Sequence, residues 1–203
     1  MAYYKDKLSY KVAIIAIIAA LYAVLVIIFL PISFYFPQVR IADCLIPQAF
    51  IFGLWGAAGL FVGCFIGNFY GGLLGFDLIG GPIANLLAGY IGYQIERRNN
   101  SKGMKRILRT QFAITVQTMI NVFIVGTYLA LFFPFIFEGT PFLNVPLIVV
   151  GWITILIGSL ISMNFLGFLV YEALRRTQLF EMETKIDTLN TAVNFVNRNF
   201  TSK

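Results

Sequence analysis

Long apolar segments constrain the fold of this chain more than any other feature. Residues 11–30 read KVAIIAIIAALYAVLVIIFL, and comparable runs recur up to Arg175. Runs of roughly 18 to 25 apolar residues are long enough to cross a bilayer as single helices. Charged residues make up 12% of the 203 residues, whereas soluble domains carry about 25%. We therefore predict a multi-pass protein of the cell membrane, whose first helix is retained because it lacks a small-residue cleavage site.

The positions of the basic residues predict how the chain is oriented. Of the 15 Lys and Arg residues, all except Arg40 fall within 5–11, 97–109 or 175–203, beside apolar segments. Cytoplasmic loops of membrane proteins carry an excess of Lys and Arg, so all three clusters are expected in the cytoplasm. The net charge of +6 then reflects topology, and nucleic-acid binding is not expected.

Glycines and prolines divide the apolar sequence into six expected crossings. Pro31 and Pro134 end the first and fifth, and glycines near 53–56 and 75 divide the stretch 41–95 into three. The expected helices are 11–30, 41–54, 56–74, 78–95, 110–133 and 146–174. The predicted fold class is all-α, an integral membrane protein with six transmembrane helices and both termini cytoplasmic. The second helix contains Pro47 and is short for a full bilayer.

The composition changes after Arg176. In the segment 177–203 apolar residues are spaced alternately by three and four, a heptad pattern: Leu179, Met182, Ile186, Leu189, Val193, Val196 and Phe200. The sequence thus predicts a membrane domain at 1–176 and a cytoplasmic amphipathic helix at 177–203. Such a helix suits a weak coiled coil, the lipid headgroups or a partner surface, and the pattern does not select among them.

Two rows of small residues indicate close helix contacts. Glycines recur at every fourth residue from Gly59 to Gly75, which predicts that the helix 56–74 is packed among its neighbours. The second row lies on the first helix and comprises Ala16, Ala19, Ala20 and Ala23. Packing within the chain and docking of another protein would both use such an alanine face.

A few polar side chains converge on the side of the membrane opposite to the basic clusters. Between positions 12 and 95 the ionisable residues, Tyr and Cys aside, are Arg40, Asp43 and Asp77. Charges at membrane depth cost about 2.5–3.5 kcal/mol each, so they usually pair or line a cavity. A local salt bridge between Arg40 and Asp43 is one explanation, but it leaves the other polar residues unexplained. The residues expected at a small-molecule pocket are Gln38, Arg40, Asp43, Asn68, Tyr70, Asp77, Asn85, Glu138 and Trp152.

The sequence offers little for catalysis or for ion conduction. It has no His to serve as a general base or zinc ligand, and Cys44 and Cys64 lack redox or metal spacing. No catalytic residue, metal or cofactor is expected, and we predict that the protein is not an enzyme. The inner halves of the helices carry amides and hydroxyls but no charged lining. A binding protein that cannot pass its ligand unaided is favoured.

The segment 39–93 resembles the membrane S components of energy-coupling-factor (ECF) transporters, most closely the queuosine-precursor (QueT-like) family. That pattern is an Arg three residues before an acid, a glycine-rich helix ending in Asn, an Asp-x-x-x-Gly turn and a small-residue helix. The matching residues are Arg40, Asp43, Asn68, Asp77, Gly81 and Asn85. The family has Glu at position 43 and a further acid at position 159, where this chain has Asp43 and Ser159.

The resemblance implies a substrate-binding subunit without an ATPase of its own. S components capture one vitamin-like molecule on the outer side. They pair through alanines of the first helix, here Ala16, Ala20 and Ala23, with an ECF coupling membrane protein. Two cytoplasmic ATPases complete the assembly, so ATP is used only by the partner subunits and this chain needs no cofactor.

The expected ligand is a queuosine precursor, a 7-deazaguanine such as queuine or its aminomethyl precursor. Asp43 would accept hydrogen bonds from the ring N–H and the exocyclic amine, and Arg40 would orient that acid. Asp77 or Glu138 would face a cationic aminomethyl group, and Tyr70 or Trp152 would stack on the ring. Three alternatives stay open: an S component for another vitamin or small heterocycle, a self-sufficient channel or permease, and a scaffold that acts through its tail.

Overall fold

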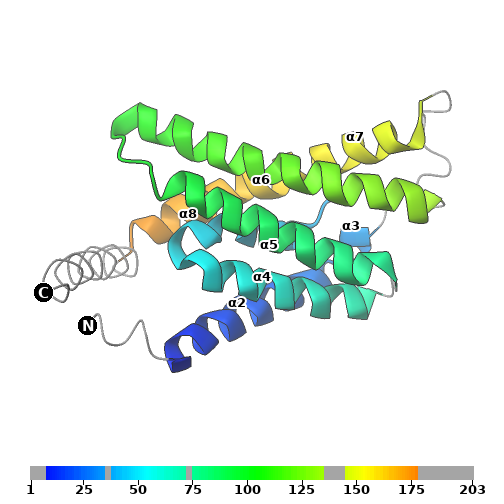
Figure 1. Cartoon of the computed structure of the whole chain (residues 1–203), viewed down its shortest axis with the longest axis horizontal. Helices are drawn as coiled ribbons and strands as arrows, with labels where there is room; N and C mark the ends of the chain where they lie inside the picture. The colour runs from blue at the N-terminus through cyan, green and yellow to red at the C-terminus, as the bar shows by residue number, and fades with distance from the viewer. Residues whose placement is uncertain (1–7, 35–37, 72–74, 135–144, 178–203) are drawn as a thin grey trace, which may run out of the picture.

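The computed structural model describes residues 8–34, 38–71, 75–134 and 145–177, and this part of the chain is helical without a strand. The elements are α2 (Leu8–Ile28), α3 (Leu30–Phe34), η1 (Ile41–Gln48), α4 (Ala49–Gly71), α5 (Phe76–Glu96), α6 (Gly103–Phe132), α7 (Leu147–Ser159), η3 (Leu160–Gly167) and α8 (Phe168–Arg175). Figure 1 shows the long helices side by side along one axis. Contacts join α2 to α4, α4 to α5, α5 to α6 and α6 to α7.

The surface of the bundle is that of a membrane protein. In the described residues, four helical stretches are long and apolar enough to cross a bilayer: Leu8–Ile28, Ile41–Gly71, Gly103–Phe132 and Leu147–Arg175. Large apolar side chains such as Leu108 and Phe165 are 63% exposed, as expected where lipid is the solvent. This surface agrees with the predicted multi-pass membrane protein.

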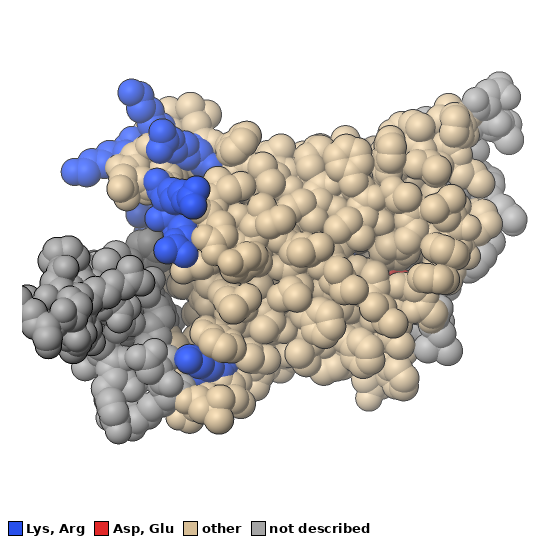
Figure 2. Space-filling model, viewed as in Figure 1, with Lys and Arg blue, Asp and Glu red and all other residues tan. Residues whose placement is uncertain are grey.

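The basic residues gather at one end of the molecule, where α5 ends and α6 begins (Figure 2). This basic end carries Lys11, Arg97, Arg98, Lys102, Lys105 and Arg109. Helix α6 begins at Gly103, seven residues before the predicted start at 110, so that Lys105, Arg106 and Arg109 lie on its first turns. At the same end, Arg106 pairs with Glu172 at 2.5 Å and thereby connects α6 to α8.

The predicted break near 53–56 lies at Gly53. The stretch Ile41–Gly71 starts as a 3₁₀-helix, continues as an α-helix from Ala49, and is interrupted at Gly53 with φ 61° and ψ −142°. Pro47 lies in the 3₁₀ segment, where it has no N–H to donate to an α-helical ladder. The second helix is therefore not the regular α-helix predicted for 41–54, and the chain turns at Gly53 into the main part of α4.

We expect Gly53→Ala to lower the free energy of unfolding by about 1–3 kcal/mol, the range for strained backbone at a special conformation. A Cβ at this position would also meet the ring of Tyr93 at 3.3 Å. The measurement is the melting temperature in detergent. Gly103→Ala is the control, because its φ of +58° is also positive but no atom lies within 4 Å of the added Cβ. A loss as large in the control would show that the Tyr93 contact contributes nothing.

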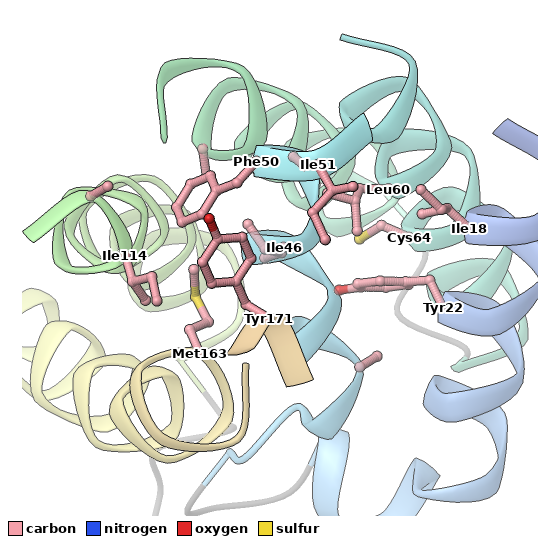
Figure 3. Packing of buried hydrophobic residues seen from close by; sticks show 14 of the residues in the cluster. Ile18, Tyr22, Ile46, Phe50, Ile51, Leu60, Cys64, Ile114, Met163 and Tyr171 are labelled. Atoms are coloured by element: carbon pink, nitrogen blue, oxygen red, sulfur yellow. The ribbon is translucent and has the colours of Figure 1, made fainter. Parts of the chain in front are cut away.

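The predicted glycine row packs α4 against α2. A Cβ added at Gly63 would lie 2.7 Å from the carbonyl oxygen of Ala19 and 2.7 Å from Cβ of Tyr22. Gly59 and Gly67 meet α2 at 2.9 Å in the same way. The two helices are close because these positions carry no side chain. Buried residues of both helices, including Ile18, Tyr22, Leu60 and Cys64, contribute to the main apolar cluster (Figure 3).

The last membrane stretch contains an irregular segment that faces η1. Residues Leu160–Gly167 form a π-helix between α7 and α8, and this π-helix contacts the 3₁₀-helix η1. Gly158 and Gly167 flank the contact. A Cβ at Gly158 would lie 2.0 Å from the carbonyl oxygen of Gln38, and one at Gly167 would lie 2.9 Å from Cγ of Pro47. π-helical segments are rare and often occur at functional sites.

Candidate functional site

A polar cavity of about 20 Å³ lies inside the bundle. Its walls come from the segment before η1, from η1 itself, and from α5, α6 and α7. The lining residues are Gln38, Arg40, Asp43, Asn85, Asn121, Val125, Ile155, Gly158 and Ser159. A cavity needs roughly 10–15 Å³ to hold one water molecule, so in this conformation it has room for about one water.

The ionic side chains predicted to share a site are buried together within the protein. Arg40 and Asp43 are 6% and 8% exposed, and Asp77 is fully buried. Arg40 lies close enough to both carboxylates for electrostatic interaction, and its Nη1 is 3.7 Å from Sγ of Cys64. The cluster therefore sets one formal positive charge against two formal negative charges, away from lipid and bulk solvent.

Asp43 is held by a chain of hydrogen-bond donors. The hydroxyl of Tyr22 donates to Oδ1 of Asp43. Asn85 donates from Nδ2 to the Tyr22 oxygen at 2.9 Å, and Asn121 donates from Nδ2 to Oδ1 of Asn85 at 3.5 Å. The chain crosses four elements, α6, α5, α2 and η1, so the carboxylate is oriented by groups that are distant in the sequence.

Asp77 has its own partners at the start of α5. Tyr128 on α6 donates its hydroxyl proton to Oδ1 of Asp77 at 2.6 Å. Asn68 on α4 donates from Nδ2 to the backbone oxygen of Asp77 at 2.7 Å. Gly81 leaves room for this arrangement, because a Cβ there would lie 2.8 Å from Nδ2 of Asn68. Asn68 and Asp77 thus form a second polar group beside the cavity lining.

Acceptor oxygens with no partner accompany both groups. The buried atoms Gln38 Oε1, Asn68 Oδ1, Asp77 Oδ2 and Asn121 Oδ1 have no hydrogen-bond partner among the described residues. Leaving a buried polar atom unsatisfied costs about 1–3 kcal/mol, so such atoms usually have a water or a ligand as partner. Gln38 and Asn121 line the cavity, which therefore presents acceptors to a molecule that carries donors.

Two of the predicted site residues that the structure describes, Tyr70 and Trp152, belong neither to the cavity lining nor to the group of Asn68 and Asp77. Tyr70 is 64% exposed, because it follows Asn68 by two residues and so points roughly 200° around the helix from it. Its ring packs edge-to-face on Phe69, with centroids 5.9 Å apart. Trp152 donates its indole N–H to Thr127 at 2.9 Å and is not part of the lining. Glu138 lies outside the described residues.

The alanine row predicted to meet a coupling protein is divided by the structure. Ala16 and Ala20 are exposed, whereas Ala23 is 6% exposed and belongs to the buried core. Ala23 is next to Tyr22 in the sequence, on the side of α2 that packs against the glycines of α4. Ala23 therefore lies inside the bundle and the exposed part of the row consists of Ala16 and Ala20, while the coupling contact itself stays a prediction.

Three site residues were missed when the sequence was read alone: Tyr22, Asn121 and Ser159. Asn121 and Ser159 line the cavity, and Tyr22 contacts Asp43. A helical pattern of polar residues along α6 was the available signal for Asn121, since Gln117, Thr118 and Asn121 share one buried face. Tyr22 gave no such signal, because a single Tyr in an apolar helix is also typical of an interfacial residue.

Comparison with known proteins gives one match. A family model described as QueT transporter matches residues 12–176, a range that contains every residue of the cavity lining. Neither a curated protein nor a solved structure matches the chain.

Proposed function

This chain belongs to the QueT transporter family, and on that premise we propose that it is the substrate-binding S component of an ECF-type uptake transporter. As a member of a transporter family it is a membrane transport protein and not an enzyme. We propose that its ligand is a queuosine precursor, a 7-deazaguanine such as queuine or its aminomethyl precursor. The alternative ligand is another vitamin or small heterocycle with hydrogen-bond donors along one edge of its ring.

The proposed topology has six crossings and both termini in the cytoplasm. In this proposal the interruption at Gly53 separates the stretch Ile41–Gly71 into two passes, and α5, a helix of 21 residues, is a further pass. With α2, α6 and the combined α7–α8 stretch, the chain then ends on the side where it began. The basic end carries the described exposed Lys and Arg residues (Figure 2), which favours a cytoplasmic position for it. The predicted domain 177–203, a cytoplasmic amphipathic helix, begins at Thr177, the last described residue. Its other residues lie outside the described part of the chain.

One observation carries the ligand proposal: buried acceptor atoms converge on one cavity. Asp43, Gln38 and Asn121 belong to its lining, and Gln38 Oε1 and Asn121 Oδ1 are acceptors without a partner among the described residues. A 7-deazaguanine presents ring N–H groups and an exocyclic amine, so its donors complement these acceptors. The excess of one negative charge in the buried cluster favours a ligand that also carries an ammonium group, as the aminomethyl precursor does.

Binding requires this cavity to enlarge. A volume of about 20 Å³ is far below the roughly 300–1,000 Å³ of small-molecule pockets. The residues from Gln38 to Arg40 form a non-helical connection into η1, and two of them line the cavity. Displacement of this connection away from Gly158 opens the site without breaking a long helix. We propose that the described conformation is the closed, ligand-free state.

The proposed partners are an ECF coupling membrane protein and two cytoplasmic ATPases, which use the ATP. The exposed Ala16 and Ala20 provide the flat helix face that such a coupling protein would contact. Co-purification of the assembly, compared between the wild type and the variant Ala16→Leu with Ala20→Leu, tests this contact. Unchanged co-purification would place the coupling surface elsewhere.

A thermal-shift panel tests the proposed function. A ligand that binds the folded state raises stability by RT ln(1 + [L]/Kd), about 2.7 kcal/mol at 100 times Kd. We expect queuine or the aminomethyl precursor to raise the melting temperature most, and hypoxanthine, which lacks the exocyclic amine, to raise it little. A larger shift from an unrelated vitamin would overturn the ligand assignment. Solute exchange by liposomes that hold this protein alone would instead favour a permease.

A further inference from the structure

Tyr22 is a buried residue beside the proposed site that no sequence pattern assigned. It lies on α2 and has no exposed surface. Figure 3 shows its ring reaching from α2 toward the segment of η1 that carries Ile46. Its hydroxyl contacts Asp43 and Asn85, whereas the cavity is lined by Asp43 and Asn85 without Tyr22. Tyr22 therefore acts on the cavity only through its neighbours.

The direction of the hydrogen bonds defines what Tyr22 does. Asn85 donates to the Tyr22 oxygen, so the single proton of that hydroxyl is directed at Asp43. Asn121 in turn donates to the carbonyl oxygen of Asn85, which orients the amide with its Nδ2 toward Tyr22. Every donor in the chain thus points toward the carboxylate. Chains of this kind polarise one another and strengthen each bond in a low-dielectric interior.

We propose that Tyr22 is a positioning residue that fixes the Asp43 carboxylate for its ligand. Tyr22 donates to Oδ1, which sets the orientation in which the carboxylate lines the cavity. A hydrogen bond to an ionised group is stronger than one between neutral groups, and positioning is effective only where the rotamer of the acid is locked. This inference rests on the proposed function, because it names a determinant of the same site.

The inference also connects the ligand site with the first helix. The side of α2 that carries Tyr22 packs on the glycines of α4, and the same helix exposes Ala16 and Ala20 on its surface. A shift of Asp43 on ligand binding therefore acts directly on a side chain of α2. Among the described helices, α2 is the one that donates a side-chain hydrogen bond to the Asp43 carboxylate.

A double-mutant cycle tests the proposal on the full-length protein in detergent, with queuine and its aminomethyl precursor as the probes. We expect Tyr22→Phe to weaken affinity about tenfold, which equals ~1.4 kcal/mol, and to lower the ligand-free melting temperature by a few degrees, because Asp43 and Asn85 each lose a buried partner. In the Asp43→Asn background the same substitution is expected to change affinity less than twofold, because the carboxylate that Tyr22 positions is gone. A residue with a purely structural role would give the same loss in both backgrounds.

Tyr171→Phe is the matched control. Tyr171 is 3% exposed, and its hydroxyl contacts Glu96 at 3.4 Å near the basic end, away from the cavity. This variant is expected to bind as the wild type does. Wild-type affinity in Tyr22→Phe, or a loss that adds fully to that of Asp43→Asn, would overturn the positioning role alone. Failure of the wild type to bind either probe would overturn the proposed function, and this inference with it.

Discussion

Replacing Asp43 with Asn is expected to weaken binding of a 7-deazaguanine at least 100-fold. The proposed contact joins two ligand donors to one carboxylate, and each hydrogen bond to an ionised group contributes roughly 1.5–3 kcal/mol. The amide keeps the shape of the side chain but loses the charge and turns one acceptor into a donor. That donor would then face the ligand's own N–H groups. Titration calorimetry on the purified variant measures the change.

The fold of this variant is expected to survive. Asp43, Asp77 and Arg40 form one cluster. Removing the formal negative charge of Asp43 therefore leaves one positive charge, on Arg40, and one negative charge, on Asp77. We therefore expect the ligand-free melting temperature to stay the same or rise. Affinity equal to the wild type would remove Asp43 from the site, and the proposed ligand contact with it.

Glu172→Gln is the control, since it makes the same acid-to-amide change at the basic end. Glu172 pairs with Arg106 and Arg175 and is not part of the cavity lining. Loss of these ion pairs is expected to lower the melting temperature by a few degrees, with ligand affinity unchanged. The pair of variants thus separates a loss of binding from a loss of stability.

The convergence of the ionic residues was predictable because membrane depth restricts charges so strongly. Arg40, Asp43 and Asp77 are far apart in the sequence, but each is too costly to expose to lipid. An enclosed cluster was therefore the expected outcome, and the structure buries all three together. The glycine row was predictable for a similar reason, since small residues at every fourth position have one evident use in a helix, which is close packing.

The aromatic residues were not predictable from composition. Tyr70 is exposed and Tyr22 is buried, but the amino-acid composition counts both simply as tyrosines. Their difference in burial depends on how α2 packs on α4. The sequence predicted Tyr70 at the site as an aromatic ring near the outer end of the helix 56–74, but a position at that end does not determine which face of the helix carries the ring. Tyr22 was overlooked because its partner Asp43 is 21 positions away.

The contribution of the stretch Leu147–Arg175 to the cavity could not be predicted from the sequence for another reason. Gly158 and Ser159 line the cavity because the π-helix at Leu160–Gly167 meets the 3₁₀-helix η1. Both departures from α-helical geometry depend on tertiary contacts, and neither has a periodicity that the sequence displays. The position of Ser159 was noted only as a departure from the family pattern, and the structure explains why that position is important.

Gly158→Ala is expected to abolish ligand binding and to destabilise the protein. The added Cβ would lie 2.0 Å from the carbonyl oxygen of Gln38 and 3.3 Å from Cα of Val39. Both are backbone atoms, so relief requires the backbone of residues 38–40 to shift. That connection carries Gln38 and Arg40 into the cavity, and a displacement of about 1 Å is enough to lose a preorganised site.

The size of the effect follows from the geometry of the contact. Overpacking a close helix contact costs about 1–3 kcal/mol or more, and a cost of 1 kcal/mol lowers the melting temperature of a chain of this length by about 2–4 °C. We therefore expect a decrease of roughly 5–10 °C and an affinity loss of at least 100-fold. Melting in detergent and calorimetric titration measure the two quantities on the same sample.

Gly151→Ala separates the two effects, because it creates a backbone clash on the same helix away from the cavity. Its Cβ would lie 2.5 Å from the carbonyl oxygen of Gly126 on α6, and Gly151 is not part of the lining. We expect a similar loss of stability with affinity close to that of the wild type, since α7 and α6 are pushed apart where no ligand group lies. Equal loss of affinity in both variants would mean that binding depends on bundle stability in general, and the close contact between Gly158 and Gln38 would then have no special role.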